Sequence, residues 1–381
     1  MDAIHWIDPH AAVSGTRKGC KSTQLYLLVR VWISHQFFVL ANVGAYFGIL
    51  NDEHEGIEDS WCSRMRYNQH KRTAREQGVW LHHGGIYMEF PQSVELIDVG
   101  PRDGLQNEPI PISLTQKKEL ILRLAQAGYK RIETASFVHP KWVPQMADAE
   151  AVAEYCNELG LTYLALTPNE RGLERAMAAQ VPQVAVFIGA SSPFNQKNIN
   201  RTTDEALHEV ASVFAKAKAN GVFVRGYVST AFSCPYQGKV SFPEVQHVVD
   251  RFVQLGADEI DIGDTDGHAN PRGVYERFAR LQELYPQTVF VAHFHDTWKM
   301  ALANTLAALQ AGIRKFDGSV GGLGGCPYSP GASGNVATED LVRMFTEMGV
   351  DTGLSLPAVK EAAQFATSLS SRLNTCSANG G

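Results

Sequence analysis

The segment Val289-Phe-Val-Ala-His-Phe294, followed by a helix-competent stretch at Thr297–Ala311 and then by Lys315-Phe-Asp-Gly-Ser319, shows the repeating unit of this chain. Its first and last pieces are short strand candidates, and the stretch between them is long enough for a helix. Strand, helix and strand in this order are typical of a parallel sheet with crossover helices. We therefore expect an α/β fold.

The same unit recurs from about Ser93 onward. The strand candidates are Val94–Val99, Arg131–Phe137, Tyr163–Thr167, Gln183–Ile188, Phe223–Val228, Glu259–Gly263, Val289–Phe294 and Lys315–Ser319. Eight such units predict a TIM (β/α)8 barrel, whose usual length of about 250 residues matches the chain from Ser93 to about Leu356. A doubly wound sheet is the alternative, but no G-x-G-x-x-G motif supports it.

Composition restricts the classes of function. The 381 residues are 44% hydrophobic and 19% charged, which is enough for one large globular core. A formal net charge of −6 without a long Lys/Arg run argues against a nucleic-acid partner and favours a small-molecule substrate. Six cysteines without a C-x-x-C pair are interpreted as reduced thiols of an intracellular protein.

Residues 1–87 differ from the rest because they lack the strand-helix rhythm. We expect them to be a poorly structured extension, disordered or non-native, ahead of a barrel domain at 88–381 that ends in a helical tail. Val31–Leu50 carries no formal charge, but polar residues interrupt it, so no membrane span or membrane partner is expected. No signal peptide is expected either.

Polar residues at strand ends are the candidates for catalysis, because TIM-barrel active sites form where the strands end. The first strand candidate ends in Asp98-Val-Gly-Pro-Arg102-Asp103, which puts a cation beside a carboxylate. Glu133 and Asp264 lie on or just after two further candidates. These carboxylates can supply the acid and base groups of a proton-coupled reaction.

The seventh strand candidate ends in His293-Phe-His295. Residues two apart on a strand face the same side, so both imidazoles can bind one ion. Two histidines held only by hydrogen bonds are the alternative. With Asp103 as the carboxylate, the set suits Mg²⁺ or Mn²⁺ and allows Zn²⁺ or Co²⁺.

A glycine-rich loop from Gly321 to Asn335 follows the last strand candidate and contains Cys326. Such a loop fits a lid that brings Cys326 to the substrate and excludes water. A phosphate-binding turn or a plain connector is the alternative, with Cys326 as a buried thiol.

Several ordered blocks of the chain resemble the 3-hydroxy-3-methylglutaryl-CoA (HMG-CoA) lyase family, within the superfamily of metal-dependent TIM-barrel lyases and Claisen-type synthases. The resemblance covers about residues 94–356. The blocks are Gly100-Pro-Arg-Asp-Gly-Leu-Gln-Asn-Glu108, Ser136-Phe-Val-His-Pro-Lys-Trp-Val-Pro-Gln-Met146, Lys197-Asn-Ile-Asn200, Arg225-Gly-Tyr-Val228, Cys234-Pro-Tyr-Gln-Gly238 and Gly321–Leu341.

The resemblance implies a carbon–carbon lyase that splits HMG-CoA into acetyl-CoA and acetoacetate, a step of leucine degradation and ketone-body metabolism. It implies an acyl-CoA substrate, a divalent metal (Mg²⁺ or Mn²⁺), a homodimer, and a cytoplasmic location, or the mitochondrial matrix in a eukaryote. The implied metal ligands are Asp103, His293, His295 and Asn335. Arg102 would neutralise the enolate, Cys326 would protonate it, and Glu133 and Asp264 would handle orientation and proton transfer.

The implied substrate-binding residues are Arg102, Ser136, His139, Asn198, Asp261, Thr265 and Asp266. Here the chain departs from the family pattern. Asp261 and His139 replace small polar residues, Asp266 replaces an apolar residue, and His268 and the Trp298-Lys-Met300 block are also unusual. Extra carboxylates should disfavour an anionic substrate unless they are paired. A lyase for a longer 3-hydroxy-3-alkylglutaryl-CoA, a condensing synthase, and an idle or membrane-tethered barrel remain alternatives.

Overall fold

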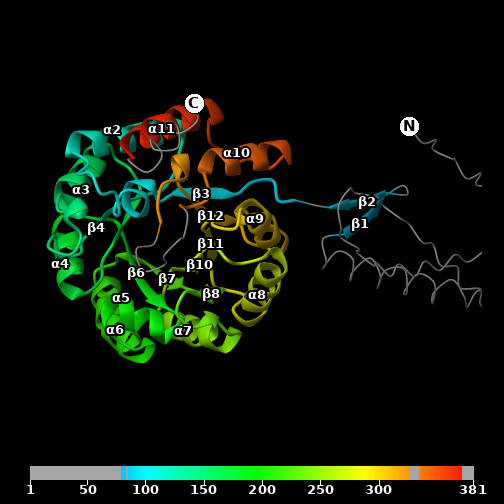
Figure 1. Ribbon diagram of the computed structural model, residues 1–381, viewed down its shortest axis with the longest axis horizontal. Coiled ribbons are helices and arrows are strands. Elements are labelled where there is room, and N and C mark those ends of the chain that lie inside the picture. The colour runs from blue at the N-terminus through cyan, green and yellow to red at the C-terminus, as the bar shows by residue number, and fades with distance from the viewer. Residues whose placement is uncertain (1–78, 83–84, 89, 326–333, 371–381) are drawn as a thin grey trace, which may run out of the picture. The chain divides into compact units, whose positions relative to one another are not determined.

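The computed structural model describes residues 79–82, 85–88, 90–325 and 334–370. Eight parallel strands close into a barrel in the order β3-β4-β5-β6-β7-β10-β11-β12, and β12 pairs with β3 (Figure 1). The strands are β3 (Glu95–Asp98), β4 (Ile132–Ser136), β5 (Tyr163–Leu166), β6 (Gln183–Gly189), β7 (Phe223–Ser229), β10 (Glu259–Asp264), β11 (Phe290–Phe294) and β12 (Lys315–Gly318). The predicted TIM barrel is confirmed, and each predicted strand agrees within two residues at either end.

Helices surround the barrel on its outside (Figure 1). They are α2 (Leu114–Ala127), α3 (Ala149–Glu158), α4 (Glu170–Ala178), α5 (Ser192–Ile199), α6 (Thr203–Ala219), α7 (Phe242–Gln254), α8 (Pro271–Leu284), α9 (Ala301–Gln310), α10 (Thr338–Glu347) and α11 (Leu356–Leu369). Local sequence fixes several helix starts. Ser113 and Gln116 form a capping box at α2, and Thr202 and Glu205 form another at α6, which satisfies backbone N–H groups that have no partner within the helix.

Three local elements differ from the prediction. Helix α9 begins at Ala301 rather than Thr297, because the Asp296 carboxylate accepts the Ala301 N–H at 3.2 Å and the intervening residues form a turn. A short antiparallel hairpin, β8 (Ser233–Cys234) with β9 (Gly238–Lys239), was not predicted. Neither was the two-stranded sheet of β1 (Val79–His82) and β2 (Gly85–Met88), which lies at the end of the segment expected to be poorly structured.

The remainder of residues 1–87, including Val31–Leu50, lies outside the described residues. Within the described ranges, no helix is both long and apolar enough to cross a membrane.

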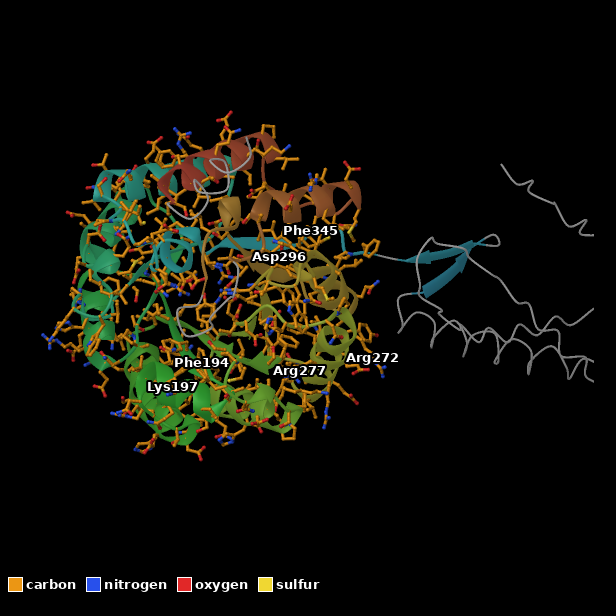
Figure 2. All side chains as sticks on the ribbon, viewed as in Figure 1. Phe194, Lys197, Arg272, Arg277, Asp296 and Phe345 are labelled. Atoms are coloured by element: carbon orange, nitrogen blue, oxygen red, sulfur yellow. The ribbon has the colours of Figure 1, made fainter. Side chains whose placement is uncertain are left out.

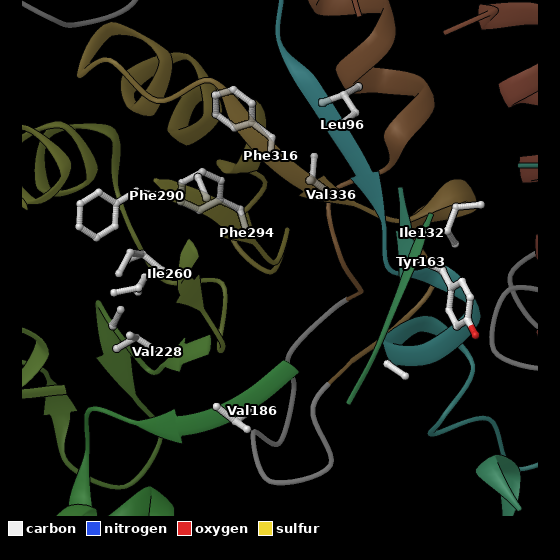
Figure 3. Packing of buried hydrophobic residues seen from close by; sticks show 14 of the residues in the cluster. Leu96, Ile132, Tyr163, Val186, Val228, Ile260, Phe290, Phe294, Phe316 and Val336 are labelled. Atoms are coloured by element: carbon white, nitrogen blue, oxygen red, sulfur yellow. The ribbon is translucent and has the colours of Figure 1, made fainter. Parts of the chain in front are cut away.

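The two faces of each barrel strand have different neighbours. Ile260 and Ile262 of β10 belong to the large core that the strands share with the outer helices (Figure 3). The alternate residues Glu259 and Asp261 therefore face the barrel interior. A small apolar cluster also lies in that interior and consists of Ile97, Leu164, Leu166, Ala185, Tyr227 and Val291. The remaining interior positions are available for charged groups.

Ion pairs fill the interior where the strands begin. The buried Glu259 carboxylate lies 2.6 Å from Arg225, 2.8 Å from Arg131 and 3.2 Å from Lys315. Burial alone would raise the pKa of Glu259, but the three cations outweigh it and lower that pKa to about 2. This charged cluster occupies the amino end of the barrel strands. We therefore expect the functional site at the opposite, carboxyl end.

Candidate active site

Arg102 and Asp103 lie in a single turn, Gly100–Gly104, that directly follows β3. The buried Asp98 carboxylate holds this turn by accepting the N–H groups of Gly100 at 2.9 Å and Val320 at 3.0 Å. A Cβ at Gly100 would lie 2.7 Å from Asp98 Oδ1, so the close approach requires glycine. The turn thus fixes Arg102 at the carboxyl end of the strands.

The Arg102 guanidinium is held by two carboxylates. Its Nη2 lies 2.5 Å from Glu133 Oε2, and its Nη1 lies 3.0 Å from Asp103 Oδ1. Burial raises the pKa of Glu133, and the Arg102 charge opposes this rise. Arg102 Nε is buried and has no hydrogen-bond partner among the described residues, so this donor is not used by them.

His293 of β11 and His295, just beyond its end, converge with Asp103. One donor atom from each lies within 4.8 Å of the others, and the two imidazole centroids are 5.4 Å apart. His295 Nδ1 is buried without a hydrogen-bond partner in the described chain, so hydrogen bonds do not account for this ring. A carboxylate and two imidazoles fit a divalent cation.

The protonation of the group in the metal-free chain follows from its surroundings. Burial would lower the pKa of His293, but a hydrogen bond to Asp317 and the charges of Asp261, Asp317 and Asp103 raise it to about 9. Burial and the neighbouring His293 lower the pKa of His295 to about 4. Burial would raise the pKa of Asp103, but Arg102 and both imidazoles lower it. At neutral pH Asp103 is therefore ionised and His295 is neutral, so both can donate an electron pair to a metal ion.

Asn335 lies against this group. Its Nδ2 donates to Asp103 Oδ2 at 2.8 Å and to the Leu323 carbonyl at 3.0 Å, and its backbone forms an isolated bridge with His295. The four residues predicted as metal ligands therefore come together from the ends of β3, β11 and β12.

Asp264 ends β10 and is fully buried. It accepts the N–H groups of His268 and Ala269 at 3.1–3.2 Å, and burial raises its pKa to about 7. The neighbouring Thr265 hydroxyl accepts the Thr230 N–H at 2.7 Å and so joins the ends of β7 and β10.

Comparisons with known proteins agree with this arrangement. The HMGL-like family model matches residues 93–366. A hydroxymethylglutaryl-CoA lyase of Bacillus subtilis is 45% identical over 279 residues, which cover 73% of this chain and 93% of the relative. The chain belongs to the hydroxymethylglutaryl-CoA lyase family. The lyase of Pseudomonas mevalonii is similar to the same degree, 45% over 74% of this chain and 94% of its own length.

Solved structures of the family share the fold. The Bacillus subtilis HMG-CoA lyase crystal structure superposes with a TM-score of 0.71 at 43% identity, covering 76% of this chain and all of that one. An Acinetobacter baumannii HMG-CoA lyase, solved in complex with coenzyme A and 3-methylmalate, gives 0.69 at 36% identity, covering 76% of this chain and 93% of that one. Members of this family are carbon–carbon lyases, and the Asp103–His293–His295 group can hold a divalent ion.

Among the residues by which this lyase departs from the family pattern, Asp266 is buried and paired. Its Oδ1 accepts the Ser233 hydroxyl at 2.6 Å, and its Oδ2 lies 3.4 Å from His268 Nδ1. The His268 ring stacks on Trp298 with centroids 4.3 Å apart. Asp266 therefore meets the exception for a paired carboxylate, and Ser233, one of its partners, was missed because no motif marks it.

The other residues predicted to bind substrate differ in position and in exposure to solvent. Ser136 ends β4, and its buried hydroxyl has no partner among the described residues. His139 is exposed, and its Nδ1 accepts the Lys141 N–H at 3.1 Å. Asn198 is half-buried on α5, where Phe194 faces the core and Lys197 is exposed (Figure 2). Cys326 lies outside the described residues.

Asp261 and Asp317 lie deeper, next to His293. Donor atoms of the three residues are within 4.8 Å of one another. Both Asp261 oxygens are buried without a hydrogen-bond partner in the described ranges, and burial raises the pKa of Asp261 well above its usual value. Asp317 was not among the residues predicted from the sequence. A signal was present, since an aspartate in the middle of a buried strand candidate needs a partner.

Proposed function

We propose that this chain cleaves HMG-CoA into acetyl-CoA and acetoacetate, with Mg²⁺ or Mn²⁺ bound by Asp103, His293, His295 and Asn335. One observation carries the proposal, namely the convergence of Asp103, His293 and His295 donor atoms within 4.8 Å. The identity of 45% along 93% of a Bacillus subtilis HMG-CoA lyase supports the choice of reaction.

The reaction breaks the bond between C2 and C3 of the acyl chain. The C3 hydroxyl loses its proton, the electron pair of the broken bond moves onto the thioester as an enolate, and C2 then gains a proton. A bound divalent ion supplies a Lewis acid that lowers the pKa of the substrate hydroxyl. The protein must therefore accept one proton, neutralise an enolate oxygen and donate one proton.

Arg102 suits the neutralising role. Its guanidinium is already oriented by Glu133 at 2.5 Å and by Asp103 at 3.0 Å, so little reorganisation is needed when charge develops. Its Nε, which lacks a hydrogen-bond partner in the described part of the chain, is the donor that we propose for the enolate oxygen. Glu133 then acts mainly by orienting Arg102.

Asp264 suits the role of proton acceptor for the hydroxyl, because a carboxylate with a pKa of about 7 exchanges protons efficiently near neutral pH. Cys326 is the proposed proton donor to C2. Ser136 and Asn198 are proposed substrate contacts, and the acyl-CoA class is supported by the coenzyme A complex of the Acinetobacter baumannii relative.

The test is release of acetyl-CoA by the purified chain, followed with a citrate synthase coupled assay, on HMG-CoA and on a panel of other 3-hydroxyacyl-CoA thioesters. We expect HMG-CoA cleavage to stop in excess EDTA and to return when Mg²⁺ or Mn²⁺ is added. Full activity in EDTA would contradict the metal requirement. No acetyl-CoA release from HMG-CoA with either ion would contradict the reaction.

A lyase for a longer 3-hydroxy-3-alkylglutaryl-CoA is a second candidate. It is favoured by the contacting set of Ser233, Asp266, His268 and Trp298 at the ends of β7, β10 and β11. Comparing kcat/KM for HMG-CoA and longer analogues, in the unmodified chain and in Asp266→Ile, separates the two. A preference for HMG-CoA that the substitution leaves unchanged would remove this candidate.

A further inference from the structure

A chain of buried ionic contacts begins beneath the proposed metal ligand His293. Asp317 Oδ2 lies 3.2 Å from His293 Nδ1. Arg225 Nη1 donates to both oxygens of Asp317, at 2.9 and 3.0 Å, and Arg225 Nε donates to Glu259 at 2.6 Å. Arg225, Asp317 and Glu259 are at most 2% exposed.

We propose that Asp317 is a positioning residue that fixes the tautomer and the orientation of His293, and that Arg225 in turn fixes Asp317. The proposal rests on the assignment of His293 as a metal ligand and deepens it. A carboxylate that accepts the Nδ1–H of a neutral imidazole leaves the lone pair on Nε2 free for an ion. Asp317 would therefore leave Nε2 as the nitrogen that binds the ion.

Backbone pairing makes this contact specific to Asp317. His293 of β11 and Asp317 of β12 are direct partners in the parallel register, so their Cα atoms are fixed side by side. Asp261 is the partner of Val291 in the neighbouring pair of strands, and its oxygens make no hydrogen bond in the described chain. Two carboxylates thus lie near the same imidazole, but only Asp317 is hydrogen-bonded to it.

Arg225 keeps Asp317 from turning away. The guanidinium holds both carboxylate oxygens, and Glu259, which holds Arg225, is itself anchored by Arg131 at 2.8 Å and Lys315 at 3.2 Å. Tyr227 adds a further restraint, because its hydroxyl accepts from Arg225 Nη1 at 3.1 Å. The orientation of His293 is therefore connected to the ion pairs at the opposite end of the barrel.

The experiment measures Mn²⁺ affinity of the full chain by electron paramagnetic resonance, without substrate. Asp317→Asn is compared with Asp261→Asn, a matched control that removes an equally buried carboxylate beside His293 without removing a hydrogen bond to it. We expect Asp317→Asn to weaken Mn²⁺ binding about 10- to 100-fold, and Asp261→Asn to leave it within about threefold. Equal losses in the two variants would show that any buried carboxyl group beside His293 supports the ion, and that the hydrogen bond from Asp317 is not what matters.

Asp317→Asn also removes the charged partner of Arg225, so this variant could fail to fold. A second measurement therefore uses the chain without a substitution at Asp317. In the Mg²⁺-loaded chain labelled with ¹⁵N-histidine, the His293 signals, assigned with His293→Gln, should show a proton on Nδ1. A proton on Nε2 would overturn the proposal. Both readings are independent of turnover, so a chain that binds Mn²⁺ and shows this tautomer but leaves HMG-CoA intact would contradict only the proposed function.

Discussion

Gly324 offers a direct test of Asn335 as part of the metal site. A Cβ at Gly324 would lie 2.4 Å from Asn335 Nδ2 and 3.4 Å from Asp103 Oδ2, and the backbone there has a φ of +127°. In Gly324→Ala the Asn335 amide must move, because it is the flexible partner in the clash. The substitution should therefore disturb the metal ligands without touching them chemically.

Two costs follow from this geometry. The backbone strain of a non-glycine residue in this region is about 1–3 kcal/mol and lowers the free energy of unfolding. Displacing Asn335 breaks its hydrogen bonds of 2.8 Å to Asp103 and 3.0 Å to Leu323. If Asn335 supports the ion as proposed, the apparent Kd for Mn²⁺ should rise about 10- to 100-fold, which corresponds to about 1.4–2.7 kcal/mol.

The control is Gly349→Ala. Gly349 also has a positive φ, +71°, but no atom of the described residues lies within 4 Å of its added Cβ. Urea unfolding should show a loss of stability in both variants, while Mn²⁺ titration followed by electron paramagnetic resonance should show weaker binding only in Gly324→Ala. Unchanged Mn²⁺ affinity in Gly324→Ala, with stability lowered as in the control, would refute a role of Asn335 in the ion site.

Three further outcomes are expected. At pH 7–8 each bound ion should displace about one proton, because His293 has a pKa of about 9 in the metal-free chain whereas His295, with a pKa of about 4, is already neutral. The affinity for the ion should therefore rise with pH up to about 9. Calorimetry in buffers of different ionisation enthalpy should give different binding heats, and equal heats would contradict the release of a proton. Cys326→Ser should keep Mn²⁺ affinity but lose most turnover, since a hydroxyl is a weaker acid than a thiol, and unchanged kcat would reduce Cys326 to a loop residue. A chain without residues 1–87 should stay soluble and active if that segment is a separate extension, whereas aggregation or loss of acetyl-CoA release would show that the barrel needs it.

The barrel could be predicted because its strands are short, apolar and evenly spaced. Strand ends also led to Arg102, Asp103 and His293, since a parallel barrel brings the carboxyl ends of its strands together whatever the intervening sequence. Side-chain direction could not be derived in this way. Asp266 is an example: the sequence left open whether its carboxylate is paired, and in the structure it accepts a hydrogen bond of 2.6 Å from Ser233, on the hairpin after β7.

Asp317 was missed for a related reason. Alternation along Lys315–Ser319 places Asp317 inside the barrel, but its meaning depends on the neighbouring strand, because the register sets His293 beside it. Register between strands that are separated by a helix follows from barrel closure, not from local sequence. Residues that touch the substrate or ion are therefore found from strand ends, whereas a residue that orients them, such as Asp317, is found only once the strands are aligned. The difference in Mn²⁺ affinity between Asp317→Asn and Asp261→Asn measures how much that alignment contributes to the site.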